Sequence, residues 1–117
     1  MYIFYQYPKC STCRKAKAEL DQLGLDIESI DIKENPPSAA FLKDLLASSE
    51  LDLKKFFNTS GQSYRSLGLK DKLADMTLDE AVELLASDGM LIKRPILIKD
   101  DKILQIGYRT PYADLNL

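Results

Sequence analysis

The chain contains two cysteines, Cys10 and Cys13, and they form a Cys-x-x-Cys motif. A thiol pair at this spacing is typical of redox proteins. In such proteins one thiolate attacks the substrate, and the second thiol resolves the adduct by forming a disulfide. The motif therefore predicts redox-active cysteines.

The position of the motif makes its two thiols unequal. The motif follows an expected strand and opens an expected helix, so Cys10 is placed at a helix N-terminus, where free N–H groups and the helix dipole favour a thiolate. Lys9 and Arg14 add positive charge on either side of the pair. Cys13 falls one turn later on the apolar helix face, where we expect a less accessible and less acidic thiol. This asymmetry predicts Cys10 as the nucleophile and Cys13 as the resolving thiol.

Two other interpretations of the cysteines remain open. A structural zinc site usually needs four Cys or His ligands, whereas the chain has two Cys and no His. Two inert structural cysteines are the second alternative, although packing alone explains a cysteine at a helix start poorly. Without histidine there is no Cys-His dyad, so activation has to come from the helix dipole and from cationic neighbours. We expect no metal and no organic cofactor.

Arginine side chains could complete an anion site beside the cysteines. Arg94 and Pro95 precede an expected strand, and the planar guanidinium of Arg94 could stabilise a thiolate or bind an oxyanion. The helix N-terminus is itself favourable for an anion such as arsenate, sulfite or a glutathione carboxylate. The alternative is that Pro95 simply begins an edge strand and that the arginines are solvated. The candidate substrate-binding residues are Ser11, Thr12, Arg14, Pro95 and Arg109.

The elements that position these residues follow from the hydrophobic pattern. The first third predicts strand, helix and strand, and a helical crossover of this length makes the two strands parallel. Thr77 and Glu80 predict a capping box in a helical middle region, and Asp100-Asp101 predicts the tight turn of a β-hairpin. The expected strands are 2–7, 25–32, 95–98 and 102–106, and the expected helices are 11–23, 38–48, 52–57, 78–88 and a short one from about residue 110.

This order predicts an α/β thioredoxin-like fold: βαβ, a helical insertion and ββα around a mixed four-stranded sheet. A chain of 117 residues is expected to form one domain, here 1–117 with the insertion at about 36–90. The net charge of −2 with no basic region argues against direct nucleic-acid binding. No signal-peptide pattern and no membrane-spanning apolar run is found, so we expect a cytoplasmic protein, in a compartment that disfavours structural disulfides.

The motifs together resemble those of the ArsC/Spx family, the arsenate reductase-like branch of the thioredoxin superfamily. The resemblance runs nearly from end to end and implies that Pro95 is cis and faces the cysteines. The matching segments are Tyr7-Pro8-Lys9-Cys10-Ser11-Thr12-Cys13-Arg14-Lys15-Ala16, Phe57-Asn58-Thr59-Ser60-Gly61 with Tyr64-Arg65, Glu80-Ala81, Leu91-Ile92-Lys93-Arg94-Pro95-Ile96 and Gly107-Tyr108-Arg109.

The resemblance implies two kinds of function. In glutaredoxin-linked arsenate reductases, a cysteine at the position of Cys10 attacks arsenate, glutathione resolves the adduct, and three arginines hold the anion. Asn58 stands at the first arginine position here, Arg94 matches the second, and Arg109 matches the third with a small shift in spacing. In Spx-like regulators the cysteine pair is a disulfide switch, and the protein binds the C-terminal domain of the RNA polymerase α-subunit.

From these observations we expect a thiol-dependent oxidoreductase of the arsenate reductase-like type, with Cys10, Cys13 and Arg94 as catalytic residues. Its substrate would be a small oxyanion or a thiol compound. Its electrons would come from glutathione or from a redox protein partner, glutaredoxin or thioredoxin. An Spx-like redox-sensing regulator is the alternative, and a glutathione-linked reductase of small disulfides is a third hypothesis.

Overall fold

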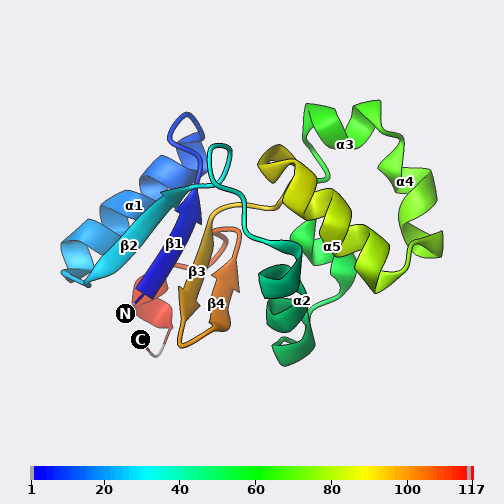
Figure 1. Cartoon of the computed structure of the whole chain (residues 1–117). Helices are drawn as coiled ribbons and strands as arrows, with labels where there is room; N and C mark the ends of the chain where they lie inside the picture. The colour runs from blue at the N-terminus through cyan, green and yellow to red at the C-terminus, as the bar shows by residue number, and fades with distance from the viewer. Residues whose placement is uncertain (1, 116) are drawn as a thin grey trace. The chain divides into compact units, whose positions relative to one another are not determined.

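The computed structural model describes residues 2–115 and 117, and the chain divides into two compact units (Figure 1). The first unit combines Met1–Asp31 with Arg94–Leu117, and the second is Ile32–Lys93. All the candidate catalytic and substrate-binding residues belong to the first unit. The organisation as one domain with an insertion at about 36–90 stays a prediction.

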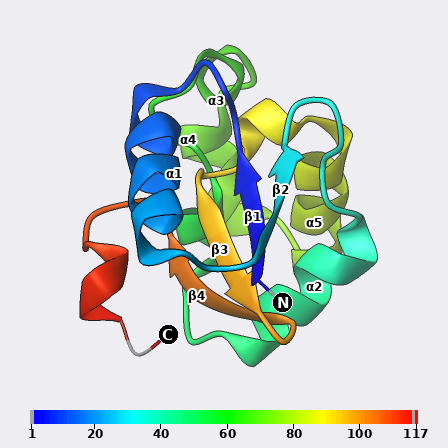
Figure 2. The same cartoon turned by 90° about the vertical axis from the view of Figure 1, so that its left-hand side faces the viewer.

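A mixed four-stranded sheet in the order β2-β1-β3-β4 forms the centre of the first unit (Figure 2). β1 pairs in parallel with β2 and antiparallel with β3, and β3 pairs antiparallel with β4. This confirms the predicted α/β fold and its mixed sheet. The strands are β1 (Tyr2–Gln6), β2 (Ile27–Asp31), β3 (Ile96–Lys99) and β4 (Lys102–Ile106).

The helix α1 (Ser11–Leu23) lies against one face of this sheet, with the 3-10 turn η4 (Tyr112–Asp114) beside it (Figure 2). It ends at Gly24, whose left-handed backbone (φ 67°) suits a residue without a Cβ. Apolar side chains spaced along one face of α1 pack onto the sheet and exclude water from it. The fully buried members of this core are Phe4, Ala16, Leu20, Leu97 and Tyr112.

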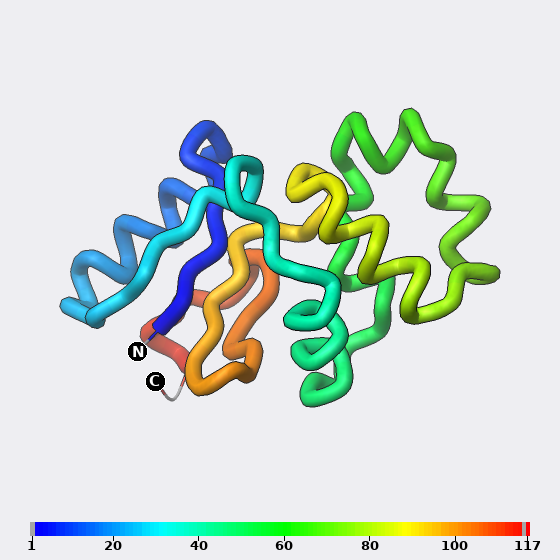
Figure 3. Tube along the Cα trace, viewed as in Figure 1, coloured from blue at the N-terminus to red at the C-terminus, as the bar shows by residue number. Residues whose placement is uncertain are grey.

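The last two strands form the predicted hairpin, traced in orange in Figure 3. Asp100 and Asp101 make its turn with positive φ angles of 52° and 63°, the backbone that a two-residue hairpin loop requires. The register pairs Tyr5 with Ile96, and Ile96 with Ile106. The end of β1, the start of β3 and the end of β4 therefore lie at the same end of the sheet, measured along the strands.

The second unit is helical. Ser38 caps its first long helix, α2 (Ala39–Ser48), by accepting a hydrogen bond from Phe41 N–H (3.1 Å). Thr77 with Glu80 forms the predicted capping box of the second long helix, α5 (Leu78–Ser87). The two long helices, α2 and α5, pack against each other (Figure 1). The elements are α2 (Ala39–Ser48), η1 (Leu53–Phe56), α3 (Gln62–Ser66), α4 (Leu69–Lys72), η2 (Leu73–Asp75), α5 (Leu78–Ser87) and η3 (Gly89–Leu91).

The boundaries correct the expectations in three places. The helix expected at 52–57 is the 3-10 turn η1, and the terminal helix expected from about residue 110 is the 3-10 turn η4. The short helices α3 and α4 occupy a stretch for which no element was predicted. Among the described helices, none has both the length and the apolar character needed to cross a membrane.

Candidate functional site

Cys10 lies at the N-terminus of α1, in the turn that follows β1. Its backbone is extended (φ −85°, ψ 123°), as is usual for an N-cap residue, and its Sγ accepts a hydrogen bond from Cys13 N–H at 3.4 Å. The Cys10 N–H donates to the Tyr7 carbonyl (2.9 Å) and closes the turn. Cys10 therefore occupies the helix start that the sequence predicted, with helix N–H groups directed at its sulfur.

The surroundings of the Cys10 sulfur favour its thiolate. Partial burial raises the pKa of Cys10, but several favourable interactions outweigh it and hold this pKa below its ordinary value. In order of size these are the hydrogen bond from Cys13 N–H, the hydrogen bond from the Cys13 thiol, the positive charge of Arg94 and the hydrogen bond from Thr12 N–H. The activation comes from the helix start and one arginine, as the absence of histidine requires.

Cys13 has the opposite character. Its side chain is fully buried on the apolar face of α1, and burial raises the pKa of Cys13 to about 12. The Tyr7 N–H donates to its Sγ at 3.5 Å and lowers this pKa, whereas the hydrogen bond to Cys10 and the Cys10 charge raise it. The expected asymmetry in burial and acidity is thus present, and the two thiols are within hydrogen-bonding reach of each other.

Arg94 and Pro95 enter the site from the start of β3. The peptide bond between them is cis, as the resemblance implied, and Pro95 is buried. The guanidinium carbon of Arg94 lies 5.3 Å from the centre of the Tyr7 ring, and the charge of Arg94 lowers the pKa of both cysteines. Arg94 is therefore placed to stabilise negative charge at the sulfurs.

Arg109 joins this region through the topology of the sheet. It follows β4, whose last residue, Ile106, pairs with Ile96 at the start of β3. In the same place, Gly107 N–H donates to the Pro95 carbonyl at 2.8 Å. The Arg109 side chain is exposed, and its own N–H donates to Gln105 Oε1 at 3.2 Å. Arg109 therefore comes shortly after the residue of β4 that pairs with the start of β3, and within the described residues no hydrogen bond joins it to either cysteine.

The remaining candidates of the motif lie on the first turn of α1. Ser11, Thr12 and Arg14 are all exposed. Thr12 N–H donates to the Cys10 sulfur, and Arg14 N–H donates to the Cys10 carbonyl at 3.0 Å. Their side chains are open to solvent and to a bound molecule. Asn58, at the first arginine position of the arsenate reductase pattern, belongs to the second unit.

Tyr7 is a site residue to which the sequence analysis assigned no role, although it opens the first segment that matches the family. Its N–H contacts Cys13, its carbonyl contacts Cys10, and its ring lies under Arg94. The available signal was an aromatic residue directly after β1, separated from Cys10 by Pro8 and Lys9. Because β1 is rich in aromatic residues, this signal did not distinguish Tyr7 from its neighbours.

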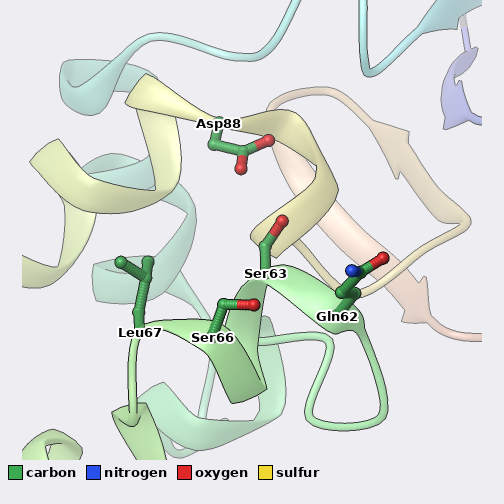
Figure 4. Close-up of a pocket in the computed structure, with 5 residues that line it drawn as sticks. All are labelled: Gln62, Ser63, Ser66, Leu67 and Asp88. Carbon is green, nitrogen blue, oxygen red and sulfur yellow. The ribbon is translucent and has the colours of Figure 1, made fainter.

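A cavity of about 370 Å³ lies in the second unit. Figure 4 shows the side chains of Ser63 and Asp88 directed into it from α3 and from the turn after α5. The Asp88 carboxylate also accepts a hydrogen bond from Met90 N–H at 2.9 Å, so it has a structural task as the cap of η3. The lining residues are Gln62, Ser63, Ser66, Leu67 and Asp88. None of them is a candidate from the sequence.

Within residues 2–115 and 117, no three His, Cys, Asp or Glu side chains gather as ligands for a metal ion. The chemically reactive or charged groups at the site are the thiols of Cys10 and Cys13 and the guanidinium of Arg94.

Known proteins are similar to this chain in sequence and in structure. The model of the ArsC family matches residues 5–111. A structure described as a possible arsenate reductase from Streptococcus mutans UA159 has 68% sequence identity and a TM-score of 0.97, and the match covers 100% of this chain and 98% of that one.

Two further relatives are similar to this chain in sequence, and only the second has a function in its name. The Bacillus subtilis (strain 168) protein YusI is 58% identical over 113 residues, which is 97% of this chain and 95% of YusI. The global transcriptional regulator Spx of Lactiplantibacillus plantarum is 32% identical over 108 residues, which is 92% of this chain and 80% of Spx. The similarity to the regulator is thus lower than the similarity to the possible reductase.

Proposed function

The chain belongs to the ArsC family, and we propose that it is a thiol-dependent oxidoreductase of this family with Cys10 as nucleophile and Cys13 as resolving thiol. The observation that carries the proposal is the contact between two unequal thiols. Cys10 caps α1 and has a lowered pKa, while the buried Cys13 thiol hydrogen-bonds to its sulfur. A reactive thiolate beside a protected thiol is the arrangement that disulfide-forming catalysis needs.

An arsenate-like oxyanion is the substrate class that this site favours. The N–H groups at the start of α1 and the Arg94 guanidinium supply hydrogen-bond donors and positive charge next to Cys10. Ser11 and Thr12 add exposed hydroxyl groups at the same helix start. The 68% identity to a possible arsenate reductase supports this choice of substrate.

In the proposed reaction, the Cys10 thiolate attacks arsenic(V) and forms an S–As bond, while one arsenate hydroxyl takes up a proton from the solvent and leaves as water. Cys13 then releases its proton to the solvent and attacks the Cys10 sulfur. The S–S bond forms, the S–As bond breaks, and its electron pair leaves with arsenic as arsenite. The two thiols lose two electrons and arsenic gains two. Glutathione, glutaredoxin or thioredoxin then reduces the disulfide.

The resolving thiol is held protonated in the resting protein. Burial is the largest cause that raises the pKa of Cys13, and the charge of Cys10 raises it further. The Tyr7 N–H and the charge of Arg94 lower this pKa, so both favour the Cys13 thiolate that attacks the Cys10 sulfur.

The proposal is tested by following arsenate-dependent oxidation of NADPH coupled through glutathione and glutaredoxin, or through thioredoxin and its reductase. We expect turnover by the wild type and its loss in Cys10→Ser. Lys17→Gln, at a half-buried position of the same helix whose side chain pairs with Asp21, is the matched control and should retain turnover. Activity in Cys10→Ser equal to wild type, or no turnover with arsenate or any small disulfide, would contradict the proposal.

A redox-sensing regulator is the second candidate, favoured by the same thiol pair and by the 32% identity to Spx. In that case the Cys10–Cys13 disulfide is itself the signal, and the partner is the C-terminal domain of the RNA polymerase α-subunit. A pull-down with that purified domain discriminates the two functions. Binding that depends on the oxidation state of the pair supports regulation, and no binding in either state removes it.

A further inference from the structure

Tyr7 contacts all three groups that the proposed chemistry uses. Its carbonyl accepts the Cys10 N–H at 2.9 Å, and its own N–H donates to Cys13 Sγ at 3.5 Å. Its half-buried ring lies under the Arg94 guanidinium, 5.3 Å from ring centre to guanidinium carbon.

We propose that Tyr7 is a positioning residue, whose ring holds the Arg94 guanidinium where its charge acts on the Cys10 sulfur, while its main chain fixes the two sulfurs. The inference rests on the proposed function, because it assigns Tyr7 a task in activating the nucleophile. Tyr7 itself need not touch the substrate.

The physical reason lies in the freedom of an arginine side chain. Arginine has several rotatable bonds, and holding its head group in one place costs conformational entropy. An aromatic face attracts a guanidinium through the ring quadrupole, and the attraction strengthens where water is partly excluded. The Tyr7 ring therefore favours the one Arg94 conformation whose charge lies near the sulfurs.

The two contributions of Tyr7 can be separated by mutation. The contacts to Cys10 and Cys13 use main-chain atoms, so they persist when the side chain changes. The contact to Arg94 uses the ring, which phenylalanine retains and leucine lacks. Tyr7→Phe thus keeps the ring contact to Arg94, and Tyr7→Leu removes it.

Tyr2 provides a matched control on the same strand. Its ring lies under the Lys99 ammonium at 5.0 Å, so Tyr2→Leu also removes an aromatic–cation contact from β1. Tyr2 is at the opposite end of β1 from the cysteine motif. The alkylation rate of Tyr2→Leu therefore shows how far the loss of an aromatic ring from β1 affects Cys10 when the contact to Arg94 is kept.

The experiment measures the rate of Cys10 alkylation by iodoacetamide in the reduced protein at pH 6.5, together with its pH profile. We expect Tyr7→Phe and Tyr2→Leu to match wild type. Tyr7→Leu should react about two- to fivefold more slowly, because the thiolate fraction falls when the cation is no longer held in place. Its pH profile should shift upward. Thermal unfolding and circular dichroism of each variant show that the fold persists.

Arg94→Gln alone and combined with Tyr7→Leu completes the test. Arg94→Gln should also slow alkylation, and adding Tyr7→Leu should slow it no further, since the ring then has no cation to position. If Arg94→Gln slows alkylation and Tyr7→Leu does not, the inference is wrong and the proposed function stands. If the two effects simply add, Tyr7 acts independently of Arg94, which also overturns the inference. If Arg94→Gln has no effect, both the inference and the assignment of Arg94 fail.

Discussion

The main-chain N–H of Cys13 donates a hydrogen bond to the Sγ of Cys10 across 3.4 Å. The second cysteine of the motif thus stabilises the first through its backbone before any disulfide forms. The Cys13 thiol adds a second hydrogen bond to the same sulfur. Cys13 is therefore part of the activation of Cys10 as well as the thiol placed to resolve its adducts.

Replacing the Cys13 thiol should make Cys10 less acidic. Cys13→Ala keeps the main-chain N–H but removes the thiol donor, so the pKa of Cys10 should rise and its alkylation at pH 6.5 should slow. Cys13→Ser keeps a donor and should stay closer to wild type. The measurement is the alkylation rate of the single remaining cysteine. Faster alkylation in Cys13→Ala than in wild type would show that this hydrogen bond does not activate Cys10.

Glu19 should contribute to stability by holding the end of the chain. Its carboxylate accepts hydrogen bonds from Tyr108 OH (2.6 Å), Tyr112 N–H (2.6 Å) and Ala113 N–H (3.0 Å). We expect Glu19→Ala to lower the free energy of unfolding by about 1–2 kcal/mol, a figure reduced for solvent screening of a half-buried carboxylate. Chemical denaturation measures the change.

Asp21→Asn is the control for this prediction. Asp21 is on the same helix and pairs with Lys17 at 2.5 Å, but the pair is exposed and should contribute at most about 0.5 kcal/mol. Equal losses in Glu19→Ala and Asp21→Asn would show that the network around Glu19 adds nothing specific.

The contribution of Glu19 should also depend on pH. Burial raises the pKa of Glu19, but the hydrogen bonds from Tyr108, Tyr112 and Ala113 outweigh it and hold this pKa below its usual range. The stabilisation is therefore fully present above the pKa of the unfolded carboxyl group, roughly 4.3, and is lost as the pH falls through the folded pKa. The difference in stability between wild type and Glu19→Gln should shrink over that acidic range. A difference that grows instead would contradict the assignment.

Gly89→Ala should be strongly destabilising for a steric reason. A Cβ at this position would lie 1.9 Å from the carbonyl oxygen of Ile32, a main-chain atom that cannot rotate away. We expect a loss of about 2–3 kcal/mol in the free energy of unfolding, typical of overpacking at a fixed backbone. Thermal and urea denaturation measure it.

Gly24→Ala separates this clash from ordinary glycine effects. Gly24 has a positive φ of 67°, and a Cβ there meets no atom within 4 Å. Its replacement should cost about 1 kcal/mol from backbone conformation alone. If Gly89→Ala is no worse than Gly24→Ala, the close approach to Ile32 does not constrain the fold.

The sequence was sufficient to predict the parts of the fold that depend on local patterns. The placement of Cys10 at a helix start follows from the aromatic strand before it and the apolar spacing of Cys13 and the residues after it. The Asp100-Asp101 turn and the Thr77 capping box were predicted for the same reason. Each of these features is encoded within a few neighbouring residues.

Two kinds of feature could not be predicted in this way: very short helices and contacts between distant segments. The helices α3 and α4 have five and four residues, too short to show a periodic pattern. Glu19 finds its partners 89 to 94 residues later in the chain. The stacking of Arg94 on Tyr7 likewise joins two segments that only the sheet brings together.

The central claim, that Cys10 is the activated nucleophile, is tested most directly by site-resolved alkylation of the reduced wild-type protein as a function of pH. Trypsin releases both cysteines in the peptide of residues 10–14, and fragmentation in the mass spectrometer locates the label. We expect Cys10 to be labelled with a midpoint pH below the pKa of a free cysteine, about 8.5, while Cys13 stays unmodified over the same pH range. Equal labelling of the two cysteines, or faster labelling of Cys13, would contradict it.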